Sequence, residues 1–503
     1  MARRRGRASL TARATLALLL MAGFYLLALA IIAGLSWILY LEGTSDNPSG
    51  YLVVLVAGGI IAIVAGIFPR RRRFVEPGPP VGSEDQPDLF DVIGQVAEAT
   101  GSPMPRDVYI VADVNAGVAH VGGFAGMGAR PIMMLGLPLI AALTVSELRG
   151  VMAHEFGHYA GGETKLAPVI YRTREAIGRT IETLARSGHW LIQSIHLPFL
   201  WYGRMYMRAT QAISRRQELA ADAMAARIAG GTSMERGLVR SHAAGLALRT
   251  YMNQELGTVL SAGYRPPVAE GFSRFLAGSE SGTLLQQKAD DASRQGRSDP
   301  FDSHPSLKER LDALKALPHE PPPSPDPPAT DLLRDQPDLE TRLLTRITGL
   351  DVPSLEAITW DEATARVWLV VWERLCTVQR AALKGITSET LPSVCLDLGP
   401  YGKQVRPRAG PKVPNEFLTL LGAALTVVLS RRGWAIDAGP GDPVTARSNG
   451  VVLRTFEVPR RLAVGQLSVE EWQRTCSESA IADLDLAQAA MAEPRVDAEA
   501  QPS

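Results

Sequence analysis

Cysteine is scarce in this chain of 503 residues, and its charges cancel. The three cysteines, Cys376, Cys395 and Cys476, are an odd number at wide spacing, which argues against a disulfide framework and suits a reducing compartment. They also lie far from every metal-like motif, so a thiolate zinc site is not expected. The 52 Lys and Arg residues balance 52 Asp and Glu residues, so no global positive field attracts nucleic acid. We therefore expect no nucleic-acid partner.

Charge is missing altogether from two stretches near the N-terminus. Residues 15–40 form a run of 26 without a charge, and at about 1.5 Å per residue such a helix exceeds the roughly 30 Å hydrocarbon core of a bilayer. A signal peptide is the competing interpretation, but its apolar region is only about 7 to 15 residues long. A second run, 51–68, just meets the spanning length, with a buried core helix as the alternative. The sequence thus predicts two transmembrane helices and the lipid bilayer as a partner.

The flanking charges predict the orientation of these helices. Five arginines precede the first run and four follow the second at 70–73, whereas the connecting residues 41–50 carry only Glu42 and Asp46. By the positive-inside rule both ends are cytoplasmic. The rest of the chain is therefore expected on the cytoplasmic side of the membrane.

Composition also divides the remaining chain. Residues 74–87 are rich in Pro, Gly and acidic residues, and seven prolines fall within 318–328; both stretches predict extended linkers. The predicted parts are a membrane anchor 1–73, a linker 74–87, a first globular region 88–317, a Pro-rich linker 318–329, a C-terminal region 330–493 and a tail 494–503.

The first globular region is predicted to be mainly α with a small β-sheet. Residues 107–112 and 131–135 have strand composition, with a Gly-rich turn at 122–128 between them. A capping-box match at Thr144–Glu147 then begins a helix whose apolar residues recur at helical spacing until Gly161.

Further along, an Ala-rich helical run begins at Ser214 and ends near Gly230. The C-terminal region is predicted as a smaller α+β unit with helices at 331–348, 360–383, 415–433 and from Ser468, and strands at 434–438 and 451–456. Its composition points to no ligand.

The first predicted helix carries the motif HEFGH. His154 and His158 are four residues apart, so both imidazoles lie on one face of a helix, where they can bind one metal ion. Glu155 lies one position round, from where it can act as general base on a metal-bound water, as in zinc peptidases. Two ordinary surface or core histidines are the alternative interpretation.

A catalytic zinc site needs a third protein ligand. Thr164 stands where a metzincin has its third histidine, which excludes that class. Glu218 and Asp222 are four residues apart on one helix face, so Glu218 can bind the metal while Asp222 accepts a hydrogen bond from a liganding histidine. Taken alone, such a pair is more typical of a solvated helix face.

Four motifs in this order resemble the HtpX-like gluzincin metallopeptidases, a family that also includes the CAAX prenyl endopeptidases. They are Asn115-Ala116, ELRGVMAHEFGH (147–158), SRRQELAAD (214–222) and SHPSLKERLDAL (303–314). The resemblance covers roughly residues 88–314 and extends to the two-span N-terminus. It implies an α+β zincin-type domain, a zinc metalloendopeptidase with one zinc ion per chain, and a multi-pass protein of a bacterial-type inner membrane.

The resemblance also implies roles for individual residues. His154, His158 and Glu218 would be the zinc ligands, Glu155 the general base, and Asp222 the partner of a ligand histidine. Asn115 and Ala116 would lie at the strand edge that pairs with substrate. His304 would stabilise the oxyanion.

The implied substrates are extended segments of membrane or misfolded proteins. Two alternatives stay open: a catalytically silent membrane scaffold, and a processing peptidase specific for one partner. Nothing in the sequence predicts an oligomeric state.

The chain departs from the family in two places. Gly117 follows Asn115-Ala116 where the family has a bulky residue, which changes the shape of the substrate edge. Only one apolar stretch, 187–203, lies between the two helix motifs, where HtpX has two spans. Because it is short and polar, we expect it to be helical and either buried or lying on the membrane face. His189 and His196 within it are interpreted as interfacial or core histidines.

Overall fold

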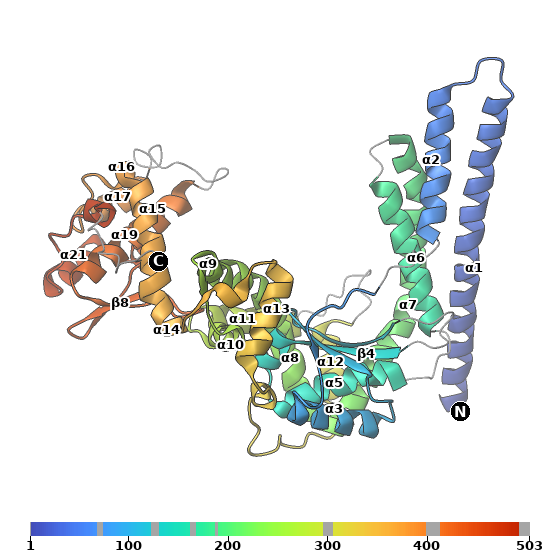
Figure 1. Cartoon of the computed structure of the whole chain (residues 1–503), viewed down its shortest axis with the longest axis horizontal. Helices are drawn as coiled ribbons and strands as arrows, with labels where there is room; N and C mark the ends of the chain where they lie inside the picture. The colour runs from blue at the N-terminus through green and yellow to red at the C-terminus, as the bar shows by residue number, and fades with distance from the viewer. Residues whose placement is uncertain are drawn as a thin grey trace, which may run out of the picture.

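The chain forms three parts, each with its own cluster of buried apolar side chains. The computed structural model describes residues 2–67, 74–121, 130–160, 167–186, 190–294, 305–398 and 413–491. A bundle of long helices stands at one end, a central region holds the largest sheet, and a smaller lobe lies at the other end (Figure 1). This confirms the predicted fold class: mainly helical with small sheets, and a smaller α+β C-terminal part.

Two antiparallel helices, α1 (Ala2–Gly43) and α2 (Gly50–Ile67), form the N-terminal part. Both are long and apolar enough to cross a membrane, over Leu18–Gly43 and Gly50–Ile67. Their outward side chains are apolar and exposed, for example Leu26 and Val54. Such a surface is unfavourable in water and suits contact with lipid.

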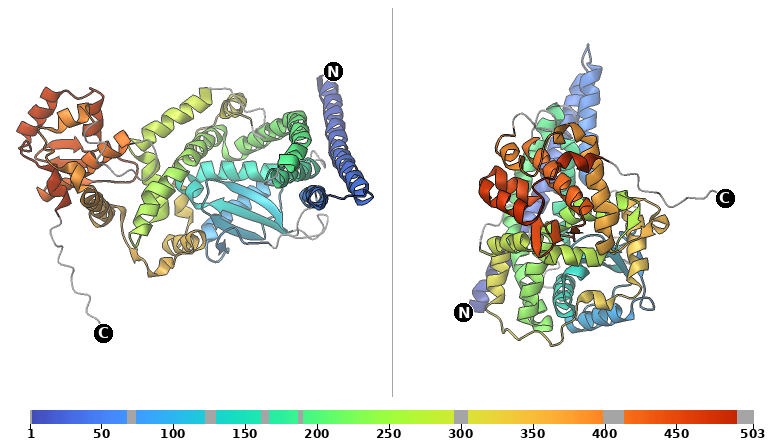
Figure 2. Two further views of the ribbon diagram at one scale, coloured as in Figure 1. Left: turned by 90° about the horizontal axis from the view of Figure 1, so that it is seen from above. Right: turned by 90° about the vertical axis from the view of Figure 1, so that its left-hand side faces the viewer.

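A second helical pair packs on α1 and α2. It consists of α6 (Ala167–Ala185) and the first half of α7 (Trp190–Ala229), which run beside the two N-terminal helices (Figures 1 and 2). Tyr202 is buried there and donates a hydrogen bond to the carbonyl of Leu20 at 2.6 Å. The segment predicted as a short buried or surface helix is thus the start of a 40-residue helix, with residues 187–189 outside the described part.

The central sheet has four strands in the order β1-β2-β4-β3. These are β1 (Pro80–Val81), β2 (Asp107–Val111), β4 (Arg130–Gly136) and β3 (Ala116–Val121). β2 and β4 are parallel, and the other pairs are antiparallel. The two predicted strands are confirmed as β2 and β4, while the predicted Gly-rich turn lies outside the described residues. β3 is the edge strand on the side of the sheet that lies against α5 (Val145–Ala160).

Helix α5 begins where the sequence predicts. The backbone N–H of Thr144 donates to the Glu147 carboxylate at 3.0 Å, and the N–H of Glu147 donates to the Thr144 hydroxyl at 3.5 Å. This is the predicted capping box. On its inner side α5 buries Leu148, Met152 and Phe156 in the central cluster. The helix is therefore held firmly at its start and along its length.

The central region has further helices. They are α3 (Pro87–Thr100), α4 (Leu137–Ala142), α8 (Gly231–Thr250), the π-helix η1 (Tyr251–Leu256), α9 (Gly257–Ser261), α10 (Val268–Ala277), α11 (Ser281–Arg294) and α12 (Leu307–Leu314).

The Pro-rich stretch does not separate two packing units as the sequence predicts. It runs along the start of α5, where the N–H of Val145 donates to the carbonyl of Pro327 at 2.9 Å. After it, η2 (Ala329–Leu332), α13 (Gln336–Thr348) and α14 (Trp360–Ala363) bury side chains in the central cluster, which extends to Val367. The reason is the apolar face of α13 together with Trp360, both of which need partners that the central region supplies.

The C-terminal lobe therefore begins near the end of η4 (Thr364–Trp368). Its elements are α15 (Leu369–Val378), α16 (Arg380–Leu383), α17 (Leu391–Leu396), α19 (Val413–Arg431), β7 (Ala435–Asp437), β8 (Thr445–Ser448), β9 (Val451–Arg454), α20 (Glu457–Ala463) and α21 (Val469–Glu478). The apolar helix α19 lies at the centre, against a three-stranded antiparallel sheet. All three cysteines are buried in this lobe and unpaired.

Candidate metal centre

The candidate site forms where α5 and the second half of α7 pack together. Gly157 on α5 faces Ala221 on α7, and a Cβ at residue 157 would lie 3.4 Å from the Cα and Cβ of Ala221. The small residues let the two helices approach closely. The Ala-rich run ends at Ala229 as expected, but its helix begins at Trp190 rather than at Ser214.

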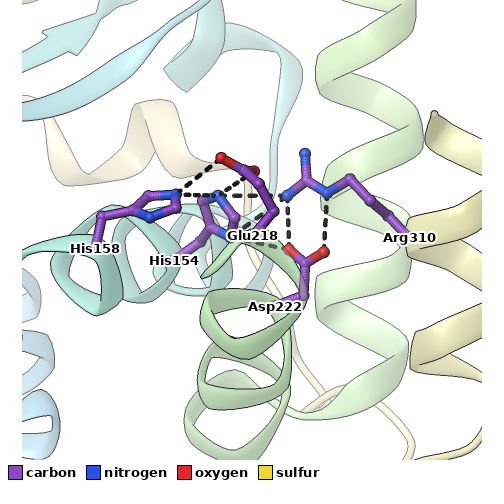
Figure 3. A network of polar contacts seen from close by, with 5 residues as sticks. All are labelled: His154, His158, Glu218, Asp222 and Arg310. Carbon is purple, nitrogen blue, oxygen red and sulfur yellow. Dashed lines mark hydrogen bonds and ion pairs between the residues drawn. The ribbon is translucent and has the colours of Figure 1, made fainter. Parts of the chain in front are cut away.

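Two imidazoles and one carboxylate meet at this crossing (Figure 3). His154 Nε2 and His158 Nε2 are 3.1 Å apart. The Glu218 carboxylate lies 3.5 Å from His154 and 3.4 Å from His158. One ligand atom from each of the three residues falls within 4.8 Å of the others. The structure therefore brings together all three predicted metal ligands.

Asp222 lies one turn beyond Glu218 and contacts the far side of His154. Its Oδ1 atom accepts a hydrogen bond from His154 Nδ1 at 2.8 Å. In the neutral imidazole that contact favours the proton on Nδ1, which would leave the lone pair of Nε2 pointing toward His158 and Glu218. The sequence predicts this partnership, and the structure has the required distance.

Arg310 on α12 is a site residue to which the sequence analysis gives no role. Its guanidinium makes two parallel hydrogen bonds to Asp222, Nη2 to Oδ1 at 2.6 Å and Nε to Oδ2 at 2.9 Å (Figure 3). The only sequence signal for it is its place in the motif SHPSLKERLDAL, because 88 residues separate it from Asp222.

The electrostatics of the site follow from this crowding of charge. Burial lowers the pKa of His154, but hydrogen bonds to Asp222 and Glu218 outweigh it and raise that pKa to about 9. Burial raises the pKa of Asp222, and the hydrogen bonds from Arg310 and His154 bring it below its usual value. The surroundings thus favour positive charge at His154, and a metal cation competes with protons for such a position.

The residues present fit a zinc ion. Two histidine nitrogens and one glutamate oxygen are the donor set of a catalytic zinc site that keeps a fourth position for water. The histidine–carboxylate contact at His154 is the usual second layer of such a site. Glu155, the predicted general base, is half-buried on α5 and lies close enough to Arg310 to help raise the pKa of that guanidinium, against the effect of burial.

The other predicted residues lie at the edges of the site or outside the described part. Ala116 is the first residue of edge strand β3, and its side chain is buried. Asn115 precedes it with an exposed side chain, while its carbonyl accepts a hydrogen bond from the N–H of Gly136 at 2.8 Å. His304 lies outside the described residues, which resume at Pro305 just before α12.

Comparisons with known proteins point to the same region. Residues 83–317 match the model of peptidase family M48. A protease HtpX homolog of Tropheryma whipplei (strain Twist) is 30% identical over 151 residues, which cover 30% of this chain and 50% of that protein. Protease HtpX of Hahella chejuensis is 24% identical over 304 residues, which cover 55% of this chain and 89% of that protein.

The chain thus spans about half the length of the Tropheryma relative, and no solved structure matches it. The matched residues include α5, α7 and α12. These helices carry the five residues that we call the metal cradle: His154, His158, Glu218, Asp222 and Arg310. The region that holds these residues, 83–317, thus matches peptidase family M48 and is similar to proteins named protease HtpX.

Proposed function

We propose that this protein is a zinc-dependent endopeptidase that holds one zinc ion with His154, His158 and Glu218. The observation that carries the proposal is the convergence of these three side chains from two helices, with Asp222 behind His154. A helix face carrying ordinary surface histidines needs no such convergence, nor a buried aspartate behind one ring.

Zinc in such a site supplies a Lewis acid that polarises the scissile carbonyl and acidifies the attacking water. Glu155 accepts the proton of that water and later delivers it to the leaving amine. Asp222 keeps the proton of His154 on Nδ1, so Nε2 stays available to the metal. His304 is proposed as a further donor to the developing oxyanion, a role that typically contributes about 3 kcal/mol.

The substrate is proposed to be an extended peptide segment. Strand β3 pairs with β4 on one side and is the last strand of the described sheet on the other, next to α5. A substrate strand added to that edge, beginning near Asn115 and Ala116, would bring its main chain past the metal cradle. Main-chain hydrogen bonds would then supply affinity, so unfolded or extended segments are favoured over folded ones.

The membrane helices support a site close to the bilayer. The central region, called the peptidase region from here on, continues through α6 and α7 onto α1 and α2. Helix α7 alone joins the metal cradle to the candidate spans. We propose a multi-pass inner-membrane protein with its catalytic region in the cytoplasm. Membrane and misfolded proteins are the proposed substrates.

The test compares zinc content and casein cleavage of detergent-purified protein with a Glu155→Gln variant. This variant keeps all three proposed ligands and removes only the base. We expect about one zinc in both proteins and cleavage by the wild type alone. Zinc in both without any cleavage would favour a scaffold or a narrow specificity, and absence of zinc from both would exclude the site.

A further inference from the structure

The candidate site contains a buried ion pair that neither the zinc chemistry nor the proton transfers require. Only 15% of the Arg310 side chain and 1% of the Asp222 side chain are exposed. Both oxygens of Asp222 are engaged by Arg310, and Oδ1 also accepts from His154. The two bonds from Arg310 orient the carboxylate, which in turn accepts from the imidazole, and Arg310 Nη2 also lies 3.4 Å from both ring nitrogens of His154 (Figure 3).

The placement of Arg310 does not depend on this pair alone. Helix α12 begins with a capping box between Ser306 and Glu309, and it buries Leu311 and Leu314 in the central cluster. Glu309 also lies 3.7 Å from Arg215 on α7. The guanidinium is thus presented from a helix that is anchored on its own, which makes it suited to orient a neighbour.

The balance of formal charge at the site also depends on Arg310. Glu155, Glu218 and Asp222 place three carboxylates around the guanidinium of Arg310. With neutral imidazoles, the four groups leave two formal negative charges, which is the charge that one divalent cation balances. Without Arg310, three carboxylates would share a largely buried site, where uncompensated charge is costly.

We propose that Arg310 is a positioning residue that acts through Asp222 to hold His154 in the orientation and tautomer that bind the metal. This inference rests on the proposed function, because it concerns the same zinc ligands. The inference goes beyond the proposed function because it assigns part of the metal affinity to a residue that is not a metal ligand.

The test is a double-mutant cycle read out as the dissociation constant for Zn²⁺, measured by chelator competition on the full chain in detergent. The variants are Arg310→Gln, Asp222→Asn and the combination. We expect each single variant to bind Zn²⁺ about 10- to 100-fold more weakly. The double variant should be no more than about threefold worse than the weaker single one, because both changes break the same chain of contacts.

Two further variants separate orientation from charge and from folding. Arg310→Lys keeps the positive charge but cannot donate two parallel bonds, so its affinity should fall at least about fivefold. Lys308→Gln removes a cation from the same helix, where Lys308 pairs with Asp312 away from the site, and should bind Zn²⁺ like the wild type. Thermal midpoints of all variants identify any that fail to fold. If Arg310→Gln fails to fold, the Zn²⁺ affinity of Arg310→Lys tests the proposal instead.

The outcomes distinguish this inference from the proposed function. If the wild type binds zinc but Arg310→Gln or Arg310→Lys binds within twofold of it, only the positioning role is wrong. Additive losses in the double variant would also overturn it, because Arg310 would then act independently of Asp222. If the wild type itself holds no zinc, both the proposed zinc site and the positioning role of Arg310 are wrong.

Discussion

The carboxylate of Glu255 accepts a hydrogen bond from the backbone N–H of Gly441. Glu255 lies on the π-helix of the central region, whereas Gly441 lies between β7 and β8 of the C-terminal lobe. Nearby, Asp442 accepts hydrogen bonds from the N–H and hydroxyl of Ser279 at 2.8 and 2.9 Å. The lobe is therefore joined to the peptidase region by specific polar contacts as well as by the chain itself.

This contact predicts a pH-dependent stability. Burial raises the pKa of Glu255 from its ordinary 4.5 to about 7, although the Gly441 hydrogen bond opposes the shift. Between those values the folded chain keeps a proton that the unfolded chain releases. The free energy of unfolding should therefore fall as pH rises from about 4.5 to about 7, by about 1 to 3 kcal/mol, and then level off.

Glu255→Gln tests this prediction, because the amide can still accept from Gly441 but cannot ionise. Thermal midpoints measured from about pH 4 to pH 8 should match the wild type at the acid end and exceed it by several degrees at pH 8. Glu98→Gln, which changes an exposed carboxylate on α3, is the control. Parallel curves for the wild type and Glu255→Gln would contradict the prediction.

Gly441 itself should tolerate no side chain. Its φ of +79° is in the left-handed region, and an added Cβ would lie 2.5 Å from the carbonyl oxygen of Phe275. Gly441→Ala should therefore loosen the lobe from the peptidase region. We expect faster cleavage by an added protease in the chain between the two, near residues 364–368, with each part still folded. Gly450→Ala, also at positive φ but with open space around its Cβ, is the matched control, and equal proteolysis of the two variants would argue against a specific junction.

The sequence indicates for a local reason which side chains meet where α5 and α7 cross. Spacings of four within 154–158 and 218–222 fix which side chains share a helix face, whatever the rest of the fold does. Arg310 is different, because only the packing of α12 on α7 brings it to Asp222. The end of the peptidase core at Val367 was likewise not predictable from composition, since seven prolines suggest a spacer but do not say whether the following helix has an apolar partner.

The Pro-rich stretch gives a third prediction. Asp326 accepts hydrogen bonds from the N–H and hydroxyl of Ser146 in the first turn of α5, at 3.0 and 2.7 Å. Burial raises the pKa of Asp326, but these bonds bring it below its usual value. Asp326→Ala should therefore destabilise the peptidase region by about 1 to 2 kcal/mol. Asp331→Ala, in the short helix η2 that follows, is a control for loss of a carboxylate whose side chain makes no hydrogen bond or ion pair among the described residues. A thermal midpoint equal to that of the wild type would mean that the stretch does not support α5.

The last prediction concerns the glutamate ligand. Glu218→Gln keeps the size of the side chain but removes the charge that the proposed zinc site requires, and only 7% of that side chain is exposed. We expect the variant to lose most of its zinc during purification and to lack casein cleavage, whereas Glu155→Gln lacks cleavage but keeps zinc. Added Zn²⁺ at high concentration should partly restore activity to Glu218→Gln and none to Glu155→Gln, because the first variant is defective in metal binding and the second in proton transfer. Stoichiometric zinc in purified Glu218→Gln would show that the third ligand is another residue. The two histidines would then still mark the site, but the helix that completes it would have to be sought elsewhere.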